Sequence, residues 1–137
     1  PQIGRFDANG FCGEELKIIH ETKKILDLPE LRVSAFTVRV PVMNAHSEAV
    51  WVTLKEKASY SDLSKAFHSQ SGLVPTLEDS SNYPTALNSS SQKDTFIGRL
   101  HQDLEDPQTW LFWVVADNIL KGAAWNGLQI AQKIFLS

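Results

Sequence analysis

The sequence contains one cysteine in 137 residues, which excludes an internal disulfide and fits a protein of the reducing cytoplasm. It has no apolar stretch of the roughly 18 residues that a membrane-spanning helix needs, and its first residues show no charged-then-apolar signal segment. It also lacks an excess of basic residues, because 13 Lys and Arg stand against 16 Asp and Glu, for a formal net charge of −3. We therefore expect neither nucleic acid nor an anionic membrane as a partner.

The length predicts one domain over residues 1–137, large enough to bury about two thirds of the unfolded chain's surface. The content of 42% hydrophobic and 21% charged residues is typical of a soluble globular protein. The first residue is Pro1 and not an initiator Met, so we expect the chain to be cut from something longer. No metal site is expected.

Three helices are predicted. Residues 1–13 read as a loop with turn residues, followed by a helix over residues 14–26. One side of that helix is apolar, whereas Glu14, Lys17, Glu21 and Lys24 form a charged stripe of the kind that usually faces solvent. Ser59, with Asp62 three residues later, predicts a capped short helix ending near His68. The third helix is expected over residues 118–135.

Alternating and apolar runs predict five strands, over residues 32–41, 49–57, 73–77, 95–101 and 109–115. Residues 78–92 form a long irregular connection, which is usually functional or interfacial. The strand at 109–115 is apolar on both faces and must be covered twice. The last helix is one candidate cover and a second copy of the protein is another, since Trp110 and Trp113 are of a type favoured at interfaces. Alternatively, both tryptophans lie in the domain's own core.

The segment from Arg39 to Ser47 is the first candidate for chemistry. It follows the end of a predicted strand, where a scaffold can hold functional side chains in place. Arg39 could grip a carboxylate through two parallel hydrogen bonds, and His46 could exchange a proton near neutral pH. Without further context, Arg39 could just as well be an ion-pair partner at a strand edge, and His46 could be a solvated loop residue.

Seven blocks, in one order, resemble the C-terminal half of aspartate-β-semialdehyde dehydrogenase. They are P-Q-I-G at 1–4, E-E-L-K and E-T-K-K-I-L at 14–26, R-V-P-V with A-H-S at 39–47, Y-P-T-A at 83–86, D-T-F-I-G-R-L at 94–100 and D-N-I-L-K-G-A-A-W-N at 117–126. The resemblance spans nearly every residue, and several blocks in one order are far more specific than any single block.

The resemblance implies an NADP-dependent enzyme of lysine, threonine and methionine biosynthesis that reduces β-aspartyl phosphate to aspartate semialdehyde with release of phosphate. His46 matches the family's acid–base histidine, and Arg39 matches the arginine that grips the substrate's α-carboxylate. Glu14 matches a glutamate facing the substrate's amino group, and Lys17 matches a lysine at the phosphate site. Asn126 is the candidate for a cofactor contact.

The family's nucleophilic cysteine and its glycine-rich NADP-binding fold belong to its N-terminal half, which is absent from this chain. No G-x-G-x-x-G follows a predicted strand here. Cys12 stands just before a helix, where the family more often has a threonine, and is expected to cap or pack and not to act as the nucleophile. We therefore expect this chain alone to be inactive. His101 replaces an arginine of the family, and His20 and His68 are expected at the surface.

The implied fold is α+β, a mixed, largely antiparallel sheet with helices on one face, resembling the catalytic domain of glyceraldehyde-3-phosphate dehydrogenase. A second subunit packs on the other face, so a homodimer or higher assembly is expected. Two alternatives stay open. One is a catalytically silent homologue that serves as a dimer-forming interaction or regulatory module. The other is a sister enzyme such as N-acetyl-γ-glutamyl-phosphate reductase, although the 39–47 and 117–126 blocks favour the aspartate enzyme.

Overall fold

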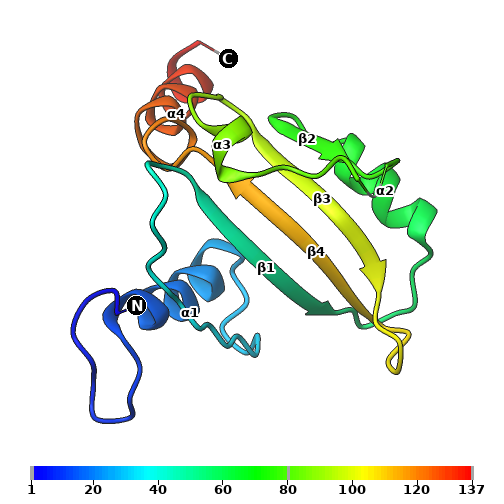
Figure 1. Ribbon diagram of the computed structural model, residues 1–137, viewed down its shortest axis with the longest axis horizontal. Coiled ribbons are helices and arrows are strands. Elements are labelled where there is room, and N and C mark those ends of the chain that lie inside the picture. The colour runs from blue at the N-terminus through cyan, green and yellow to red at the C-terminus, as the bar shows by residue number, and fades with distance from the viewer. Residues whose placement is uncertain (1, 80, 137) are drawn as a thin grey trace. The chain divides into compact units, whose positions relative to one another are not determined.

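The computed structural model describes residues 2–79 and 81–136 (Figure 1). The loop predictions for Pro1 and Ser80 lie outside these residues. The chain divides into two compact units, Pro1–Pro41 and Val42–Ser137.

The first unit is built on helix α1 (Gly13–Ile25), close to the predicted bounds. Cys12 is its N-cap residue and also forms an isolated bridge with Phe6, so the preceding turn closes on the start of the helix. After the helix, Asp27 takes a left-handed backbone conformation with φ of 53°, which turns the chain away from the helix axis. The predicted helix is confirmed.

The predicted strand at 32–41 is wrong. This segment has no strand ladder with any described residue. Its side chains do alternate, but Phe36, Val38 and Val40 point to solvent, and Phe36 is 89% exposed. The N–H of Thr37 donates to a carboxylate of α1 and not to a neighbouring strand. Alternation favours an extended backbone, but a strand also needs a pairing edge.

The second unit is built on a four-stranded sheet. Its strands are β1 (His46–Thr53), β2 (Leu73–Thr76), β3 (Thr95–Gln102) and β4 (Thr109–Ala116). Their order is β1-β4-β3-β2, in which β4 is antiparallel to both neighbours and β2 is parallel to β3. The predicted mixed, largely antiparallel sheet in an α+β fold is confirmed. β1 begins and ends earlier than the strand expected at 49–57.

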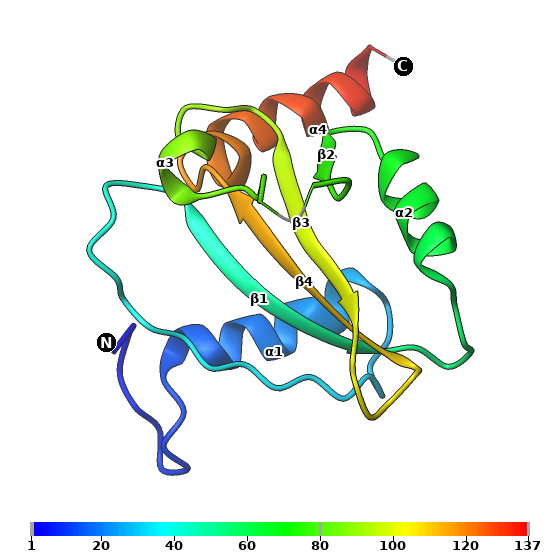
Figure 2. The same ribbon diagram turned by 45° about the vertical axis from the view of Figure 1, so that its right-hand side comes forward.

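Around Phe112 and Trp113, strand β4 is covered on both faces by its own unit. Helix α2 (Tyr60–His68) starts at the predicted Ser59–Asp62 cap and runs beside β2 and β3 (Figure 2). Its Phe67 packs edge-on against Phe112, with ring centroids 5.4 Å apart. On the opposite face, Nε1 of Trp113 donates to the carbonyl oxygen of Pro84 at 3.0 Å.

Trp110 is only 3% exposed and lies in the core of the second unit. For this residue the interface alternative is wrong, because its own unit buries it. Trp113 is half-buried. The indole N–H of Trp110 has no hydrogen-bond partner among the described residues.

The C-terminal helix is not one regular element. A π-helical turn, η1 (Leu120–Ala124), precedes α4 (Trp125–Phe135). The carboxylate of Asp117 accepts the N–H groups of Ile119 and Leu120, which starts the wide turn. The apolar side expected to cover the sheet is exposed at Leu128, Ile130 and Ile134. A short helix, α3 (Ala86–Ser89), interrupts the connection expected to be irregular at 78–92.

Candidate functional site

Two predicted site residues meet on helix α1. Nζ of Lys17 lies 3.3 Å from both carboxylate oxygens of Glu14. The spacing of three residues places both side chains on one face of the helix. The Lys17 side chain is 57% exposed and that of Glu14 is 35% exposed, so both charges remain accessible to a small polar molecule.

Glu15 links this helix to the segment that carries Arg39. Its buried carboxylate accepts the N–H of Cys12 and the N–H of Thr37, each at 2.8 Å. Thr37 lies two residues before Arg39, so the extended segment is tied to the helix next to Glu14. The hydrogen bond from Thr37, followed by that from Cys12, lowers the pKa of Glu15 below its ordinary value of 4.5. This role of Glu15 was not predicted from the sequence. The available signal was a glutamate three residues after the N-cap.

Cys12 has the packing role expected of it. The residue is 1% exposed, and its Sγ lies 3.2 Å from Oγ1 of Thr37. A thiol enclosed in this way has no access to a substrate carbonyl.

His46 is the first residue of β1, is exposed, and follows Ala45, whose φ is 76°. Oδ1 of Asn118 accepts the N–H of Ala45 at 2.8 Å, and Nδ2 of Asn44 donates to Asp117 at 2.8 Å. These contacts hold the turn in front of His46 in a backbone conformation that is unfavourable for alanine. These roles of Asp117 and Asn118 were not predicted, although both residues lie in the 117–126 block.

Asp117 is 1% exposed, and its carboxylate also accepts the N–H of Ser91 at 2.7 Å. The N–H of Leu120, then that of Ser91, hold the pKa of this carboxyl below its ordinary value of 3.8. The hydrogen bonds from these backbone N–H groups thus compensate for the burial of the Asp117 charge. It joins three segments behind His46.

The structure brings Glu14 and Lys17 together and ties the Arg39 segment to them, all in the first unit. His46 belongs to the second unit, as does Asn126, which is exposed on α4. Convergence of the four substrate-site residues on one molecule stays a prediction. Within residues 2–79 and 81–136, no group of three or more His, Cys, Asp or Glu side chains could hold a metal ion. In the same residues, no helix is long and apolar enough to cross a membrane.

The remaining sequence predictions concern three histidines. His20 and His68 are exposed as expected, and Nδ1 of His68 lies 2.8 Å from the carbonyl oxygen of Ser64. His101 is exposed, and its Nδ1 lies 2.7 Å from the carbonyl oxygen of Arg99.

Comparison with known proteins identifies a family over most of the chain. Residues 1–121 match the family model described as semialdehyde dehydrogenase, dimerisation domain. An aspartate-semialdehyde dehydrogenase of Bacillus subtilis is 40% identical over 98% of this chain, and one of Legionella pneumophila is 41% identical over 96% of it. The chain spans 39% of the length of each of these relatives.

Solved structures give the same result. The aspartate semialdehyde dehydrogenase II of Vibrio cholerae, complexed with ASA, superimposes with a TM-score of 0.90 at 34% identity. The match covers 96% of this chain and 39% of that one. The enzyme of Francisella tularensis superimposes with a TM-score of 0.86 at 27% identity, over 96% of this chain and 38% of that one.

Proposed function

The chain belongs to the family of semialdehyde dehydrogenase dimerisation domains, and from this we propose that it is the substrate-binding and dimerisation part of an aspartate-semialdehyde dehydrogenase. The proposed reaction is the NADP-dependent reductive dephosphorylation of β-aspartyl phosphate to aspartate semialdehyde. One structural observation supports it most. The Glu15–Thr37 hydrogen bond anchors the Arg39 segment to the helix that presents Glu14 and Lys17.

The proposed roles follow from the chemistry of each side chain. The planar guanidinium of Arg39 matches a carboxylate through two parallel hydrogen bonds. The carboxylate of Glu14 suits the substrate's ammonium group, and the ammonium of Lys17 suits its phosphate. The Glu14–Lys17 ion pair keeps both charges in place before the substrate binds. The bound substrate would replace this pair with two others, one between Glu14 and its ammonium group and one between Lys17 and its phosphate.

His46 is proposed as the acid and base of the reaction. Its imidazole would remove a proton from the attacking thiol and return one to the departing group. The thiol is not Cys12, which is buried, and it would come from the part of the relatives that this chain does not cover. The hydrogen bonds of Asn118 and Asn44 behind the Ala45 turn would hold the imidazole still during this transfer.

The reduced cofactor, NADPH, would supply the hydride when bound. This chain's proposed contribution is Asn126, whose exposed amide on α4 is free to hydrogen-bond a polar group of the cofactor. The proposal includes a cytoplasmic location and a place in lysine, threonine and methionine biosynthesis. It also includes assembly as a homodimer.

The test measures phosphate-dependent reduction of NADP by aspartate semialdehyde in the intact enzyme that contains this chain. His46→Ala should lower kcat about 10²- to 10⁴-fold, the usual contribution of acid–base catalysis. His68→Ala is the matched control, because His68 is an exposed histidine on α2 without a proposed role, and should leave kcat within about twofold. Equal activity of the two variants would contradict the assignment. An intact chain with no activity would favour the silent homologue.

A further inference from the structure

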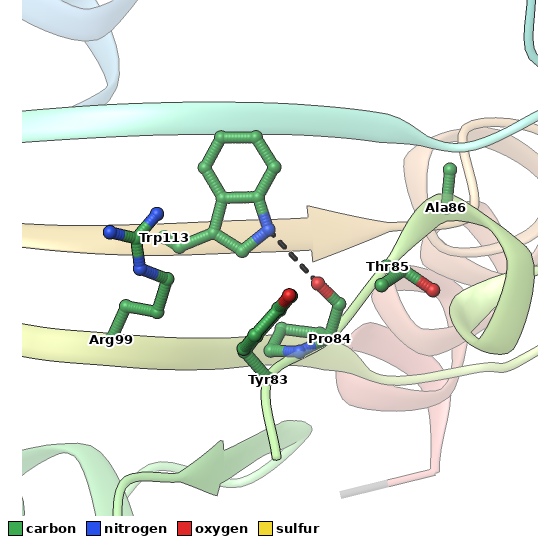
Figure 3. A pocket seen from close by; sticks show the side chains of 6 residues that line it. All are labelled: Tyr83, Pro84, Thr85, Ala86, Arg99 and Trp113. Atoms are coloured by element: carbon green, nitrogen blue, oxygen red, sulfur yellow. Dashed lines mark hydrogen bonds between the residues drawn. The ribbon is translucent and has the colours of Figure 1, made fainter. Parts of the chain in front are cut away.

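A hollow of about 490 Å³ opens on the second unit, and none of the predicted site residues lines it. Its lining residues are Tyr83, Pro84, Thr85, Ala86, Arg99 and Trp113. Figure 3 shows the indole of Trp113 above Tyr83, with the Pro84 carbonyl to the right of both rings and the guanidinium of Arg99 to the left of the indole. The hollow therefore combines aromatic walls with one cation.

A β-bulge aims Arg99 at this hollow. Gly98 pairs with Trp113 and His101 pairs with Leu111, so two residues of β3 oppose one residue of β4. The extra residue places Arg99 beside Gly98 and Trp113, at a left-handed φ of 55°. Such a φ is unfavourable for an arginine, and bulges commonly redirect a side chain. Among the described residues, no hydrogen bond or ion pair to the guanidinium satisfies it.

The β3–β4 turn of the same sheet carries one apolar and one acidic side chain, which complement the aromatic and cationic lining of the hollow. The β3–β4 turn carries Leu104, which is fully exposed, followed by Glu105, also exposed. The turn is held in shape because Oδ1 of Asp103 accepts the N–H groups of Glu105 and Asp106. The Glu105 carboxylate itself has no hydrogen bond or ion pair within residues 2–79 and 81–136.

An apolar patch separates the hollow from the turn. Directly paired residues lie on one face of a sheet, so Trp51, Leu111 and His101 form a row next to the row of Trp113 and Gly98. Trp51 is 63% exposed. Thr109, two residues before Leu111 in β4, has its side chain on the same face. Its carbonyl oxygen accepts the N–H of Asp103 at the base of the turn.

We propose that the hollow receives the Leu104–Glu105 turn of a second copy of this chain, with Arg99 of each copy paired to the partner's Glu105. The hollow and the Leu104–Glu105 turn lie on opposite sides of the row that contains Leu111. A two-fold axis perpendicular to the sheet at this row therefore places the turn of one copy over the hollow of the other. The contact then forms twice, as an isologous interface requires. Trp51 and Leu111 pack at its centre, where aromatic residues are favoured. The proposal rests on the dimer-forming part of the proposed function.

A second copy fits this surface better than a free small anion does. The unpaired cation lies at the hollow and the unpaired carboxylate lies in the β3–β4 turn, with the exposed apolar patch between them. A small anion would satisfy Arg99 but would leave Trp51 and Leu104 in water. The paired charges would orient the two copies, which is how charges usually contribute at interfaces.

The test is a charge exchange, read by sedimentation equilibrium of this 137-residue chain. Arg99→Glu and Glu105→Arg should each raise the dimer Kd at least about tenfold, because each places like charges together. The double variant Arg99→Glu with Glu105→Arg should return Kd to within about threefold of the parent value. Lys65→Glu is the control: it changes the net charge by the same amount on α2, which packs on the opposite face through Phe67.

Arg99→Gly separates binding from folding. Glycine adopts the left-handed backbone without strain, so this variant should keep or raise the urea midpoint of the monomer while still weakening the dimer. The proposed contact would be contradicted if neither single exchange changed the dimer Kd, or if the double variant did not recover the parent Kd. Either result would leave the homodimer itself unaffected. A chain that stays monomeric at about 100 μM, well above the Kd of a stable homodimer, would overturn the dimer itself and the contact with it.

Discussion

Two buried carboxylates, Glu15 and Asp117, each accept backbone N–H groups from segments distant in the sequence. Glu15 reaches Thr37, and Asp117 reaches Ser91. Neither carboxylate forms an ion pair with a described residue. Backbone donors are fixed in position, so these bonds specify the position of a loop more narrowly than a flexible lysine or arginine would.

For Glu15 this implies a pH dependence of stability. Its folded pKa lies below the ordinary 4.5 because of the bonds from Thr37 and Cys12. The unfolded state therefore binds more protons at acid pH, and the stabilisation, complete above pH 4.5, is lost as pH falls through the folded pKa. Urea unfolding of the first unit, followed across this range, should show that loss.

Glu15→Gln should remove this pH dependence and lower stability at neutral pH. The control is Glu21→Gln, which changes an exposed glutamate of the same helix. A Glu15→Gln variant that still loses stability in parallel with the parent would show that another carboxyl is responsible.

Asn118 allows a test of how His46 is positioned. Asn118→Ala removes the acceptor of the Ala45 N–H, and the loss of one hydrogen bond should cost about 1 kcal/mol in urea unfolding. In the intact enzyme kcat should fall while KM for aspartate semialdehyde changes little, since the imidazole and not the substrate pocket is loosened. An unchanged kcat would leave Asn118 with a structural role only.

At the scale of elements, the Tyr83–Ala86 segment packs against β3 through a glycine. A Cβ at Gly98 would lie 2.6 Å from Cδ of Pro84 and 3.0 Å from Oγ1 of Thr76. The absence of a side chain is thus what lets the segment reach Trp113 and form the wall of the hollow.

Gly98→Ala should consequently destabilise the second unit by about 1–3 kcal/mol, the usual cost of overpacking. Gly127→Ala is the control, because no atom lies within 4 Å of its added Cβ on helix α4, and it should stabilise by about 0.5–1 kcal/mol. Urea unfolding checks both. A neutral Gly98→Ala would mean that the Pro84 segment can move away from the sheet.

For the whole molecule, the present chain alone should not reduce NADP in the presence of aspartate semialdehyde and phosphate. Cys12 is 1% exposed, and the sequence has no glycine-rich turn to bind the dinucleotide. The chain should still bind phosphate weakly at Lys17, because half of a binding site gives little affinity. Phosphate-dependent turnover by the purified chain would contradict this, and titration of Lys17→Ala with phosphate provides the comparison for binding.

Local sequence patterns were enough to predict most helices and strands and the family. Periodicity and capping are properties of neighbouring residues, so helix α1, the Ser59–Asp62 cap of α2 and strands β2, β3 and β4 were predicted close to their observed bounds. The ordered motif blocks placed His46, Arg39, Glu14 and Lys17 as candidates because the identities of these residues alone carried the resemblance.

Tertiary structure decided what depends on partners far away in the chain. Residues 32–41 alternate like a strand but remain unpaired, because a ladder requires a second edge. Trp110 is buried by its own unit, and Glu15 and Asp117 become anchors only when Thr37 and Ser91 present their N–H groups. The direction of Arg99 follows from the bulge in the β3–β4 register. Register is a relation between strands, and no local pattern encodes it.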